Sequence, residues 1–349
     1  MSEPSSSFRH RAHEAFEGEL VAEEAEHTKE SWPENIVVRV RGPFYDVWTS
    51  QGVIRCVVRG ALKRERRRED LVVVGDRVEV RIVGPGEGVI EAVAPRRRAL
   101  VRRARDREVA QVIVANLDQL VVVLAAAQPE LSLGMLDRFL VVAESQDLPT
   151  VICLNKVDLD PEGRARAALA PYRAIGYPVV ETSVVTRVGL EELWRMLEGK
   201  LSALAGPSGV GKTSLVKAFR PELELRIGAV SEATGRGRHT TTASELIQLD
   251  ERTFLVDTPG IGVLHLWALL PEELGQYYRE FRRYLGACAY RDCRHLDEPG
   301  CAVRAAVEAG EIDAGRYERY RAIYQDLEEE AERQGRWEVE RLRRERRTR

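Results

Sequence analysis

Between residues 35 and 98 the hydrophobic positions come in short runs separated by turn residues such as Gly42-Pro43 and Gly84-Pro85-Gly86. The runs are rich in β-branched and aromatic side chains, and they cover residues 36–40, 45–48, 53–58, 77–83 and 89–93. Five short strands within about sixty residues are typical of a small all-β barrel. We therefore predict an OB-fold over residues 35–98, with a tight turn at 74–78 leading into its fourth strand.

The pattern changes after residue 109, where apolar runs alternate with helical spacing. Strands are expected at 112–115, 120–125, 150–154, 177–180, 201–205 and 253–256, and helices at 134–145, 161–175, 190–197 and 214–219. This alternation predicts an α/β domain with a mostly parallel sheet and helices on both faces. Further helices are expected at 271–285, 303–308 and 313–332, the last with an aromatic face that favours docking over cofactor binding.

The strand at 201–205 leads into Gly206-Pro-Ser-Gly-Val-Gly-Lys-Thr213, which has the G-x-x-x-x-G-K-[ST] spacing of a P-loop. Glycines let such a loop turn tightly and point successive N–H groups at phosphate oxygens. Lys212 would reach the β- and γ-phosphates, and the Thr213 hydroxyl would ligate Mg²⁺. The alternative is an ordinary glycine-rich turn, which the strand, Lys-Thr pair and following helix disfavour together. The predicted phosphate cradle comprises Gly206, Ser208, Gly209, Val210, Gly211, Lys212, Thr213 and Ser214.

Asn155-Lys156-Val157-Asp158 follows the strand at 150–154, at the strand end where an open α/β sheet binds ligands. The Asp158 carboxylate could accept from guanine N1–H and the exocyclic amine together, a donor pair that adenine lacks. Asn155 would orient the loop and Lys156 would pack over the base. Thr182-Ser183 could supply an N–H to guanine O6, although such a pair is usually a helix N-cap. A surface turn would explain the four-residue pattern alone, but its place beside a P-loop predicts guanine-nucleotide binding.

Two further motifs complete a magnesium-nucleotide set. Asp257-Thr-Pro-Gly260 follows the strand at 253–256, so Asp257 would hold Mg²⁺ through water and the Gly260 N–H would contact the γ-phosphate. The polar segment 235–242 contains three adjacent threonines, of which Thr241 is our choice to close over Mg²⁺.

Three cysteines and a histidine gather in a short C-terminal stretch as C-x4-C-x-H-x5-C. Three thiolates and one imidazole form a closed tetrahedral ligand set that is typical of structural zinc. The alternatives are reduced cysteines, which the clustering of three cysteines with a histidine disfavours, and a disulfide, which the expected cytoplasmic location disfavours. The expected zinc ligands are Cys288, Cys293, His295 and Cys301, whereas Cys56 and Cys153 are expected to be buried as small hydrophobes.

The order of these motifs is unusual, because the guanine motif precedes the P-loop and Asp257-Thr-Pro-Gly260 comes last. The chain resembles the RsgA (YjeQ) family of circularly permuted GTPases over about residues 35–325. The segments that carry this resemblance, besides the cysteine set, are Asn116-Leu-Asp-Gln119, Leu136-Asp-Arg-Phe139, Asn155-Lys-Val-Asp158, the P-loop, Gly237-Arg-His-Thr-Thr-Thr242 and Asp257-Thr-Pro-Gly260. The resemblance implies a GTP hydrolase that binds the small ribosomal subunit and its rRNA. It also implies that GTP hydrolysis to GDP is stimulated by the subunit and is coupled to late maturation and to release.

The residue that orients the attacking water is not evident from the motifs. Ile261 follows Gly260 where a glutamine is common, and isoleucine neither donates nor accepts a hydrogen bond. We therefore expect slow intrinsic turnover in which Lys212 and Thr241 act with a further group. His239 is our candidate for that group, and a purely structural role in the loop is the alternative.

Charge is distributed unevenly along the 349 residues although the formal net charge is only −3. The first thirty residues carry an excess of glutamate, and the last nine are mostly arginine. The basic segment 63–68 could contact RNA or simply be solvated, and Phe44, Tyr45 and Trp48 could stack on bases or belong to the core. The absence of a signal pattern and of a long apolar run predicts a cytoplasmic protein with no membrane contact, which we expect to be a monomer.

The predicted domains are a disordered acidic arm (1–34), the OB-fold barrel (35–98), the permuted GTPase domain (99–270), a zinc-binding helical subdomain (271–332) and a basic tail (333–349). A non-catalytic RNA-binding protein whose nucleotide only sets conformation is one alternative function. A GTPase that acts on another RNA or on translation is a second. The complete Lys-Thr-Asp set disfavours the first, and the sequence leaves the second open.

Overall fold

The computed structural model describes residues 35–60, 72–103, 110–223, 245–257 and 269–347. The acidic arm and the basic segment 63–68 lie outside these residues. The chain divides by its contacts into two compact units, one comprising residues up to Val101 with Gln111–Asn116, the other comprising Arg102–Ala110 and Leu117–Arg349.

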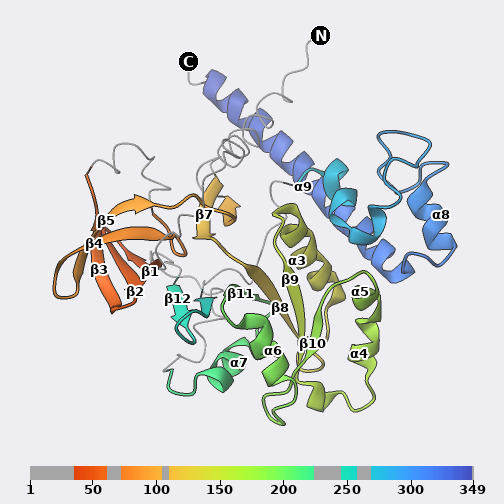
Figure 1. The fold of residues 1–349 in the computed structure, drawn as a ribbon. Coiled ribbons are helices and arrows are strands. Elements are labelled where there is room, and N and C mark those ends of the chain that lie inside the picture. The colour runs from red at the N-terminus through yellow and green to blue at the C-terminus, as the bar shows by residue number, and fades with distance from the viewer. Residues whose placement is uncertain (1–34, 61–71, 104–109, 224–244, 258–268, 348–349) are drawn as a thin grey trace. The chain divides into compact units, whose positions relative to one another are not determined.

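Five strands form a closed barrel in the first unit (Figure 1). They pair in the order β1-β2-β3-β5-β4, with β3 and β5 parallel and the other neighbours antiparallel. The Val37 N–H donates to Asp76 O (3.0 Å) and the Val78 N–H to Asn35 O (3.1 Å), so β1 also meets the start of β4 and closes the barrel. The predicted OB-fold is confirmed. Its strands are β1 (Ile36–Arg41), β2 (Phe44–Thr49), β3 (Gly52–Val58), β4 (Val78–Gly84) and β5 (Glu87–Val93).

The predicted turn before β4 is built around Asp76, whose side chain is fully buried. Its carboxylate accepts from the Val73 N–H at 2.8 Å and from two nitrogens of Arg96 at 2.8 and 2.9 Å. A bidentate arginine satisfies a buried carboxylate well. Arg96 therefore helps to hold the turn.

The first unit extends beyond the predicted barrel boundary at residue 98. Strand β7 (Ala110–Ala115) pairs with β6 (Ala99–Arg103), and the Ala115 N–H donates to Val74 O at 2.9 Å. The amide of Asn116 adds bonds to Gly75 O and from the Arg97 N–H. The boundary of the first unit therefore follows the hydrogen bonds of β7 and Asn116, which could not be inferred from the amino-acid composition.

The second unit contains the predicted α/β sheet in the order β10-β9-β8-β11-β13-β12. All neighbouring pairs are parallel except β12–β13, which is antiparallel at the edge. The strands are β8 (Gln119–Ala125), β9 (Thr150–Asn155), β10 (Val179–Glu181), β11 (Leu201–Ala205), β12 (Glu245–Gln248) and β13 (Phe254–Asp257). Strand β12 was not predicted, because it has only two apolar residues, Leu246 and Ile247, between polar neighbours.

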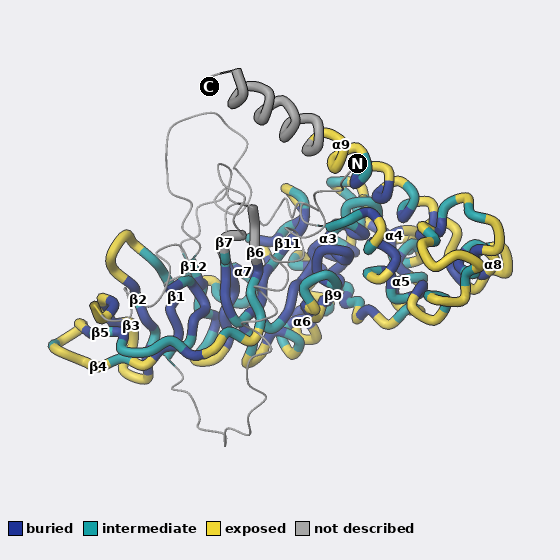
Figure 2. The backbone as a smooth tube through the Cα atoms, turned by 90° about the horizontal axis from the view of Figure 1, so that it is seen from above, coloured by how far each residue is buried: buried dark blue, intermediate teal, exposed yellow. Residues whose placement is uncertain are grey.

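Helices cover both faces of this sheet, as predicted (Figures 1 and 2). Helices α6 (Leu190–Leu197) and α7 (Lys212–Phe219) share one apolar core with alternate residues of β8 and β9, including Val121, Val123 and Val151. Helix α3 (Leu133–Ser145) packs on the opposite face, where it also contacts the C-terminal helices. Burial of the β8 and β9 side chains on both sides explains why these strands read as continuous apolar runs.

The single helix expected over 161–175 is two short helices, α4 (Arg164–Ala168) and α5 (Ala170–Ala174). Pro171 lies at the start of α5, where its missing N–H costs nothing. In the middle of one long helix the same ring would remove a hydrogen bond. The prediction of a continuous helix was therefore wrong, and Pro171 in the sequence already indicated the break.

The C-terminal helices surround an aromatic core. The expected helix at 271–285 is instead two 3-10 helices, η3 (Pro271–Tyr277) and η4 (Arg279–Phe281), with Tyr278 extended between them. The extended backbone directs the buried Tyr278 ring against Phe281 and Tyr320, with ring centroids 5.1 Å away in both cases. Packing has thus overridden helical spacing here.

The remaining helices are α8 (Ala302–Glu308) and α9 (Ala314–Arg347). The predicted aromatic face of α9 is buried in this core, which confirms its docking role; its members are Tyr317, Tyr320, Ile323, Tyr324 and Leu327. The helix runs on through the segment predicted as a basic tail. Over the part of the chain that the structure describes, no helix is long and apolar enough to cross a membrane.

Polar residues at the start of β8 join it to β11. The Asp118 carboxylate accepts from the Leu201 N–H at 2.8 Å. The buried Gln119 amide donates to Met196 O (2.7 Å) and to the Ser202 hydroxyl (3.0 Å), and it accepts from Lys200 Nζ (3.1 Å). These bonds give a structural role to the polar residues of the Asn116–Gln119 motif.

Replacing Gln119 with leucine should lower the free energy of unfolding by about 2 kcal/mol, because it leaves buried partners without a hydrogen bond. Chemical denaturation of the purified chain measures this loss. Gln276→Leu changes an exposed glutamine in the same unit and should stay within about 0.5 kcal/mol of the parent. Equal stability of the two variants would contradict the role assigned to Gln119.

Candidate functional site

The predicted nucleotide motifs meet at the carboxyl edge of the parallel strands. Ala125 of β8 lies beside Asn155 of β9, and Ala205, the last residue of β11, lies beside Val122 of β8. The end of β13 follows next to β11 in the same sheet. Loops that leave neighbouring parallel strands at one edge form a crevice, which is the usual ligand position in such sheets.

The side-chain amide of Asn155 connects three of these loops. It is almost fully buried, it donates from Nδ2 to the Val210 carbonyl at 2.8 Å, and its Oδ1 accepts from the Thr182 hydroxyl at 3.1 Å. The base motif, the P-loop and the Thr182-Ser183 turn are therefore held together without a ligand. The sequence placed Asn155 as an organiser of one loop, and the structure extends that role to three.

Two P-loop glycines are required by close approach. A Cβ atom on Gly206 would lie 2.1 Å from the Val123 carbonyl oxygen, and one on Gly211 would lie 2.3 Å from Asn155 Nδ2. Both residues also have positive φ, at 136° and 97°. A side chain at either position would push the P-loop away from the neighbouring strand or from the base motif.

Lys212 is folded inward over the P-loop. Its Nζ donates to the carbonyls of Gly206 (2.7 Å) and Pro207 (2.8 Å), and 6 % of the residue is exposed. Burial lowers the pKa of Lys212 to about 8, because two neutral carbonyls only partly replace its hydration. A bound phosphate would supply the missing negative charge and restore the usual pKa.

The other residues of the predicted phosphate cradle lie just before and just after Lys212 in the sequence. Gly211 caps α7, Thr213 lies half-buried in its first turn, and Ser214 is exposed beside it. Ser208 and Gly209 are exposed at the tip of the loop, and Val210 is buried beneath it. The helix N-terminus therefore presents free N–H groups at the place where the sequence predicted phosphates.

The base motif is held by the loop that follows β8. The Ala126 N–H donates to Asn155 O at 2.8 Å, and Lys156 Nζ donates to the Gln128 carbonyl. Lys156 itself has a left-handed backbone (φ 61°), which turns the chain into the 3-10 helix η1 (Val157–Leu159). Asp158 is exposed in that turn. The contacts from Ala126 and Gln128 were not predicted, because they come from backbone atoms of a loop without a recognisable motif.

Ser183 does not offer its N–H to a ligand in this structure. That N–H donates to Val188 O at 3.0 Å, while its hydroxyl accepts from the Thr186 N–H at 3.0 Å. The Thr182 N–H is also used, since it donates to Leu154 O at 2.8 Å. The Thr182-Ser183 turn lies where predicted, but its role here is to shape the loop.

The magnesium and γ-phosphate residues are only partly described. The backbone of Asp257 ends β13, one residue beyond the pairing of Val256 with Ala203 of the P-loop strand. Gly260, His239 and Thr241 lie outside the described residues. The topology thus brings Asp257 to the same edge as the P-loop, and the roles of the other three stay predictions.

The predicted zinc ligands converge in space. One ligand atom from each of Cys288, Cys293, His295 and Cys301 lies within 4.8 Å of the others. His295 Nδ1 is 3.6 Å from the sulfurs of both Cys288 and Cys301. That spacing fits the edge of a tetrahedron whose ligands sit about 2.2 Å from a central ion. The cluster could therefore hold one Zn²⁺ ion with no open coordination position.

The surrounding loop is arranged to favour thiolate ligands. The N–H groups of Ala302 and Arg304 point at the sulfurs of Cys288 (3.4 Å) and Cys301 (3.5 Å). Burial raises the pKa of Cys293 to about 12 and lowers that of His295, so the isolated pocket favours neutral groups. A divalent cation would reverse this balance for the thiols and accept a neutral imidazole.

Glu298 organises the same loop, although the sequence did not single it out. Its carboxylate accepts from the Leu296 N–H (2.9 Å) and from the N–H and Nε of Arg294 (3.2 and 3.0 Å). Burial alone would raise the pKa of Glu298, but these hydrogen bonds lower it to about 2. Its position between His295 and Cys301 was the only available signal.

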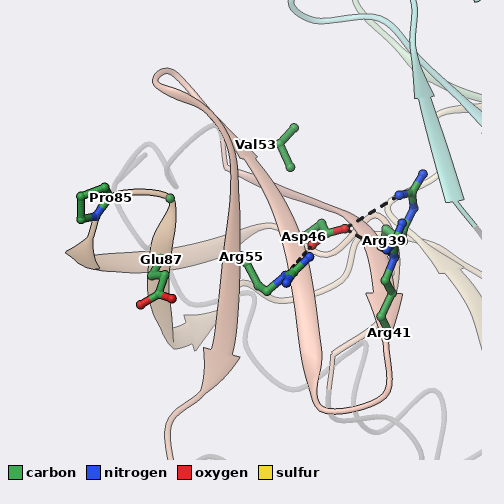
Figure 3. Close-up of a pocket in the computed structure, with 8 residues that line it drawn as sticks. Arg39, Arg41, Asp46, Val53, Arg55, Pro85 and Glu87 are labelled. Carbon is green, nitrogen blue, oxygen red and sulfur yellow. Dashed lines mark ion pairs between the residues drawn. The ribbon is translucent and has the colours of Figure 1, made fainter.

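The barrel carries a second candidate site, an open basic hollow on the outer face of β1, β2 and β3 with a volume of about 470 Å³ (Figure 3). Three guanidinium groups surround the Asp46 carboxylate: Arg39 at 4.0 Å and Arg41 and Arg55 at 3.8 Å. Phe44 is exposed nearby with Arg55 5.9 Å from its ring centroid, whereas Tyr45 is buried in the barrel core. Of the three aromatic residues considered for stacking, Tyr45 belongs to the core and Phe44 faces solvent.

Comparison with known proteins agrees with this geometry. Residues 93–267 match the family described as RsgA GTPase, and residues 34–90 match the RsgA N-terminal domain. The chain is 43% identical over 304 residues to the small ribosomal subunit biogenesis GTPase RsgA of Chlorobaculum parvum, covering 84% of this chain and 98% of that protein. It is 45% identical over 287 residues to the protein of the same name from Moorella thermoacetica, covering 82% and 94%.

Two solved structures share the fold. The crystal structure of YjeQ from Thermotoga maritima has a TM-score of 0.70 and 38% identity, covering 84% of this chain and 97% of that one. The structure of YloQ, a circularly permuted GTPase, has a TM-score of 0.68 and 30% identity, covering 88% and 99%. The motif order, the barrel, the Cys3His cluster and these matches lead to one assignment: the chain belongs to the RsgA family of GTPases.

Proposed function

We propose that this chain hydrolyses GTP to GDP with Mg²⁺ and acts in the biogenesis of the small ribosomal subunit. The observation that carries the proposal is the junction at Asn155, which fixes a guanine-type loop against a P-loop that holds Lys212. The names of the relatives supply the ribosomal context. We further propose that the subunit stimulates hydrolysis and that hydrolysis accompanies maturation and release.

Each part of the nucleotide has a protein group suited to it. Asp158 would recognise the guanine donors, Lys156 would cover the base, and Asn155 would keep both loops in register. The P-loop N–H groups and the Lys212 ammonium would neutralise charge that develops on the γ-phosphate. Thr213, Thr241 and Asp257 would hold Mg²⁺, which supplies electrostatic stabilisation when bound, and Gly260 would contact the γ-phosphate.

The attacking water needs a polar partner that Ile261 cannot provide. We assign that role to His239, because it directly precedes the three threonines that include the proposed Mg²⁺ ligand Thr241. A small ribosomal subunit that fixes this segment would bring His239 toward the water and so accelerate hydrolysis.

Three basic parts of the chain are suited to contact with rRNA, and the Cys3His cluster is suited to stabilise the C-terminal subdomain. The hollow lined by Arg39, Arg41 and Arg55 places guanidinium groups where a phosphate could displace the Asp46 carboxylate. The basic segment 63–68 and the arginine-rich C-terminus are further candidates for phosphate contact. The Cys3His cluster would bind one structural Zn²⁺ ion.

Hydrolysis of GTP by the purified chain should rise when small ribosomal subunits are added. Lys212→Ala should abolish the stimulated rate, with a loss of at least about a hundredfold, because it removes a charge aimed at the transferred phosphoryl group. Single-turnover hydrolysis on saturating subunits is the measurement. Lys217→Ala, on the same helix, is the matched control and should hydrolyse GTP at the parental rate.

Two further variants separate the predicted roles in that assay. Thr241→Ala should retain GDP binding and lose stimulation, since it removes a Mg²⁺ ligand that acts only with the γ-phosphate. His239→Ala should retain GTP and subunit binding and lose most of the stimulated rate. If His239→Ala is stimulated as well as the parent, His239 is structural. If large subunits or free RNA stimulate GTP hydrolysis as strongly as small subunits do, the assignment to the small subunit is wrong.

Asp158→Asn should weaken GDP binding and shift preference toward xanthine nucleotides, because an amide can donate to the xanthine carbonyl. Competition between guanine and xanthine diphosphates for the purified variant measures this shift. Asp160→Asn is the control, since the Asp160 carboxylate caps α4 through the N–H groups of Arg164 and Ala165. It should change stability without changing base preference. An unaltered guanine preference in Asp158→Asn would remove Asp158 from the base site.

Elemental analysis should find about one zinc ion per chain, as a complete tetrahedral ligand set predicts. Cys293→Ala should lose that ion and speed amide exchange in residues 286–302, with a smaller effect at the P-loop. Cys56→Ala alters a buried thiol of the barrel and should keep the zinc. A folded parent protein that contains no metal would rule out the assignment.

A further inference from the structure

A buried cluster of charged side chains joins α3 of the sheet domain to α9 of the C-terminal helices. Asp137 on α3 is fully buried, and its carboxylate accepts from Arg316 Nη1 (2.6 Å), Arg319 Nε (2.5 Å) and the Tyr172 hydroxyl (2.6 Å). Arg316 completes the cluster by donating to Glu280 at 2.7 and 3.2 Å. Two carboxylates thus face two guanidinium groups, and the formal charges balance.

Arg316 is the centre of this cluster. Only 2 % of it is exposed, and its guanidinium carbon lies 4.9 Å from the Tyr172 ring centroid and 4.7 Å from that of Tyr278. Two carboxylates therefore accept hydrogen bonds from this guanidinium group, and it also lies over two aromatic rings. A buried ion pair with both partners satisfied is costly to break, because the remaining charge is left without a partner.

Helix α3 is also attached to the C-terminal helices near its C-terminal end. Glu144, near the end of α3, accepts from Arg279 Nε (2.6 Å), Arg282 Nη2 (2.5 Å) and the Tyr177 hydroxyl (3.0 Å). Ion pairs at Asp137 and Glu144 therefore attach α3 to the C-terminal helices along most of its length. The position of α3 is set by these helices as well as by the sheet.

The segment just before α3 holds the base motif. Ser132 caps the helix, and the loop that joins it to β8 donates from the Ala126 N–H to Asn155 O and accepts from Lys156 Nζ at the Gln128 carbonyl. Pro129 of the same loop lies beside the P-loop, with its Cδ 3.6 Å from where a Cβ on Gly209 would be. A displacement of α3 would therefore move the partners of Asn155 and Lys156.

We propose that Arg316 is a positioning residue for guanine-nucleotide binding, acting through Asp137, α3 and the 126–132 loop on Lys156. The inference rests on the proposed function only in taking residues 155–158 as the base site. Rigid elements in continuous contact can carry such coupling. Because coupling between two sites is reciprocal, bound nucleotide should in turn stabilise the docking of the C-terminal helices on α3.

The test compares GDP affinity in three full-length variants. Arg316→Lys keeps the charge but cannot bridge both carboxylates, and its dissociation constant for fluorescent GDP should rise about fivefold or more. Arg319→Ala removes only the less buried arginine partner of Asp137 and should give a smaller rise in the same direction. Arg138→Ala is the matched control, since it breaks an exposed ion pair with Asp326 between the same two helices. Its affinity should stay within about twofold of the parent.

A second measurement separates positioning from simple loss of stability. If Arg316 acts through Lys156, then Arg316→Lys should cost little further affinity in a Lys156→Ala background, whereas independent effects would add. Amide exchange should show GDP protecting α9 and η3 in the parent and in Arg138→Ala, but not in Arg316→Lys.

Parental GDP affinity in folded Arg316→Lys and Arg319→Ala overturns the inference and makes the cluster purely structural. Additive losses in the double variant overturn the route through Lys156. If Arg316→Lys does not fold, Arg319→Ala and its combination with Lys156→Ala decide the question alone. Failure of the parent chain to bind GDP would instead refute the proposed function.

Discussion

The side-chain amide of Asn155 is a constraint on which the nucleotide site depends. Its Oδ1 accepts from the Thr182 hydroxyl at 3.1 Å, and its Nδ2 donates to the Val210 carbonyl at 2.8 Å. Both bonds can form only if β9, β10 and β11 end at the same edge of the sheet. Spatial adjacency of strand ends satisfies this condition, and the order of the strands along the chain does not matter. A permuted chain can therefore present the same loops as one that begins at the P-loop.

Much of the fold could be predicted because its signals are local. The barrel strands and β8, β9 and β11 appear as compact apolar runs, and α6 and β11 have the predicted bounds. The P-loop and the base motif lie at strand ends, as predicted, because each motif begins where such a run ends. The Cys3His cluster could be predicted because all four of its residues lie within one short stretch of sequence.

Features that depend on tertiary contacts could not be predicted in the same way. Helical spacing at 271–285 is overridden by an extended Tyr278 whose ring fills an aromatic core. The bond between Asp137 and Arg316 joins residues 179 positions apart, so the sequence could show only that Asp137 stands in a recognisable motif. Ser183 was chosen for its N–H, but the fold uses that group to close its own turn. Backbone contacts such as those from Ala126 leave no trace in side-chain identity.

The permuted order makes the segment 258–268 the covalent link between the end of β13 and the C-terminal helices. Fully extended, eleven residues reach at most about 40 Å. The sheet and the C-terminal helices are therefore joined twice, through the ion pairs on α3 and through this covalent link to Asp257. Doubling the length of such a link would add only about 0.6 kcal/mol of closure entropy. Insertions after Gly260, among residues 261–268, should therefore be tolerated by the fold, and they would lengthen this link without replacing a residue proposed to contact the nucleotide.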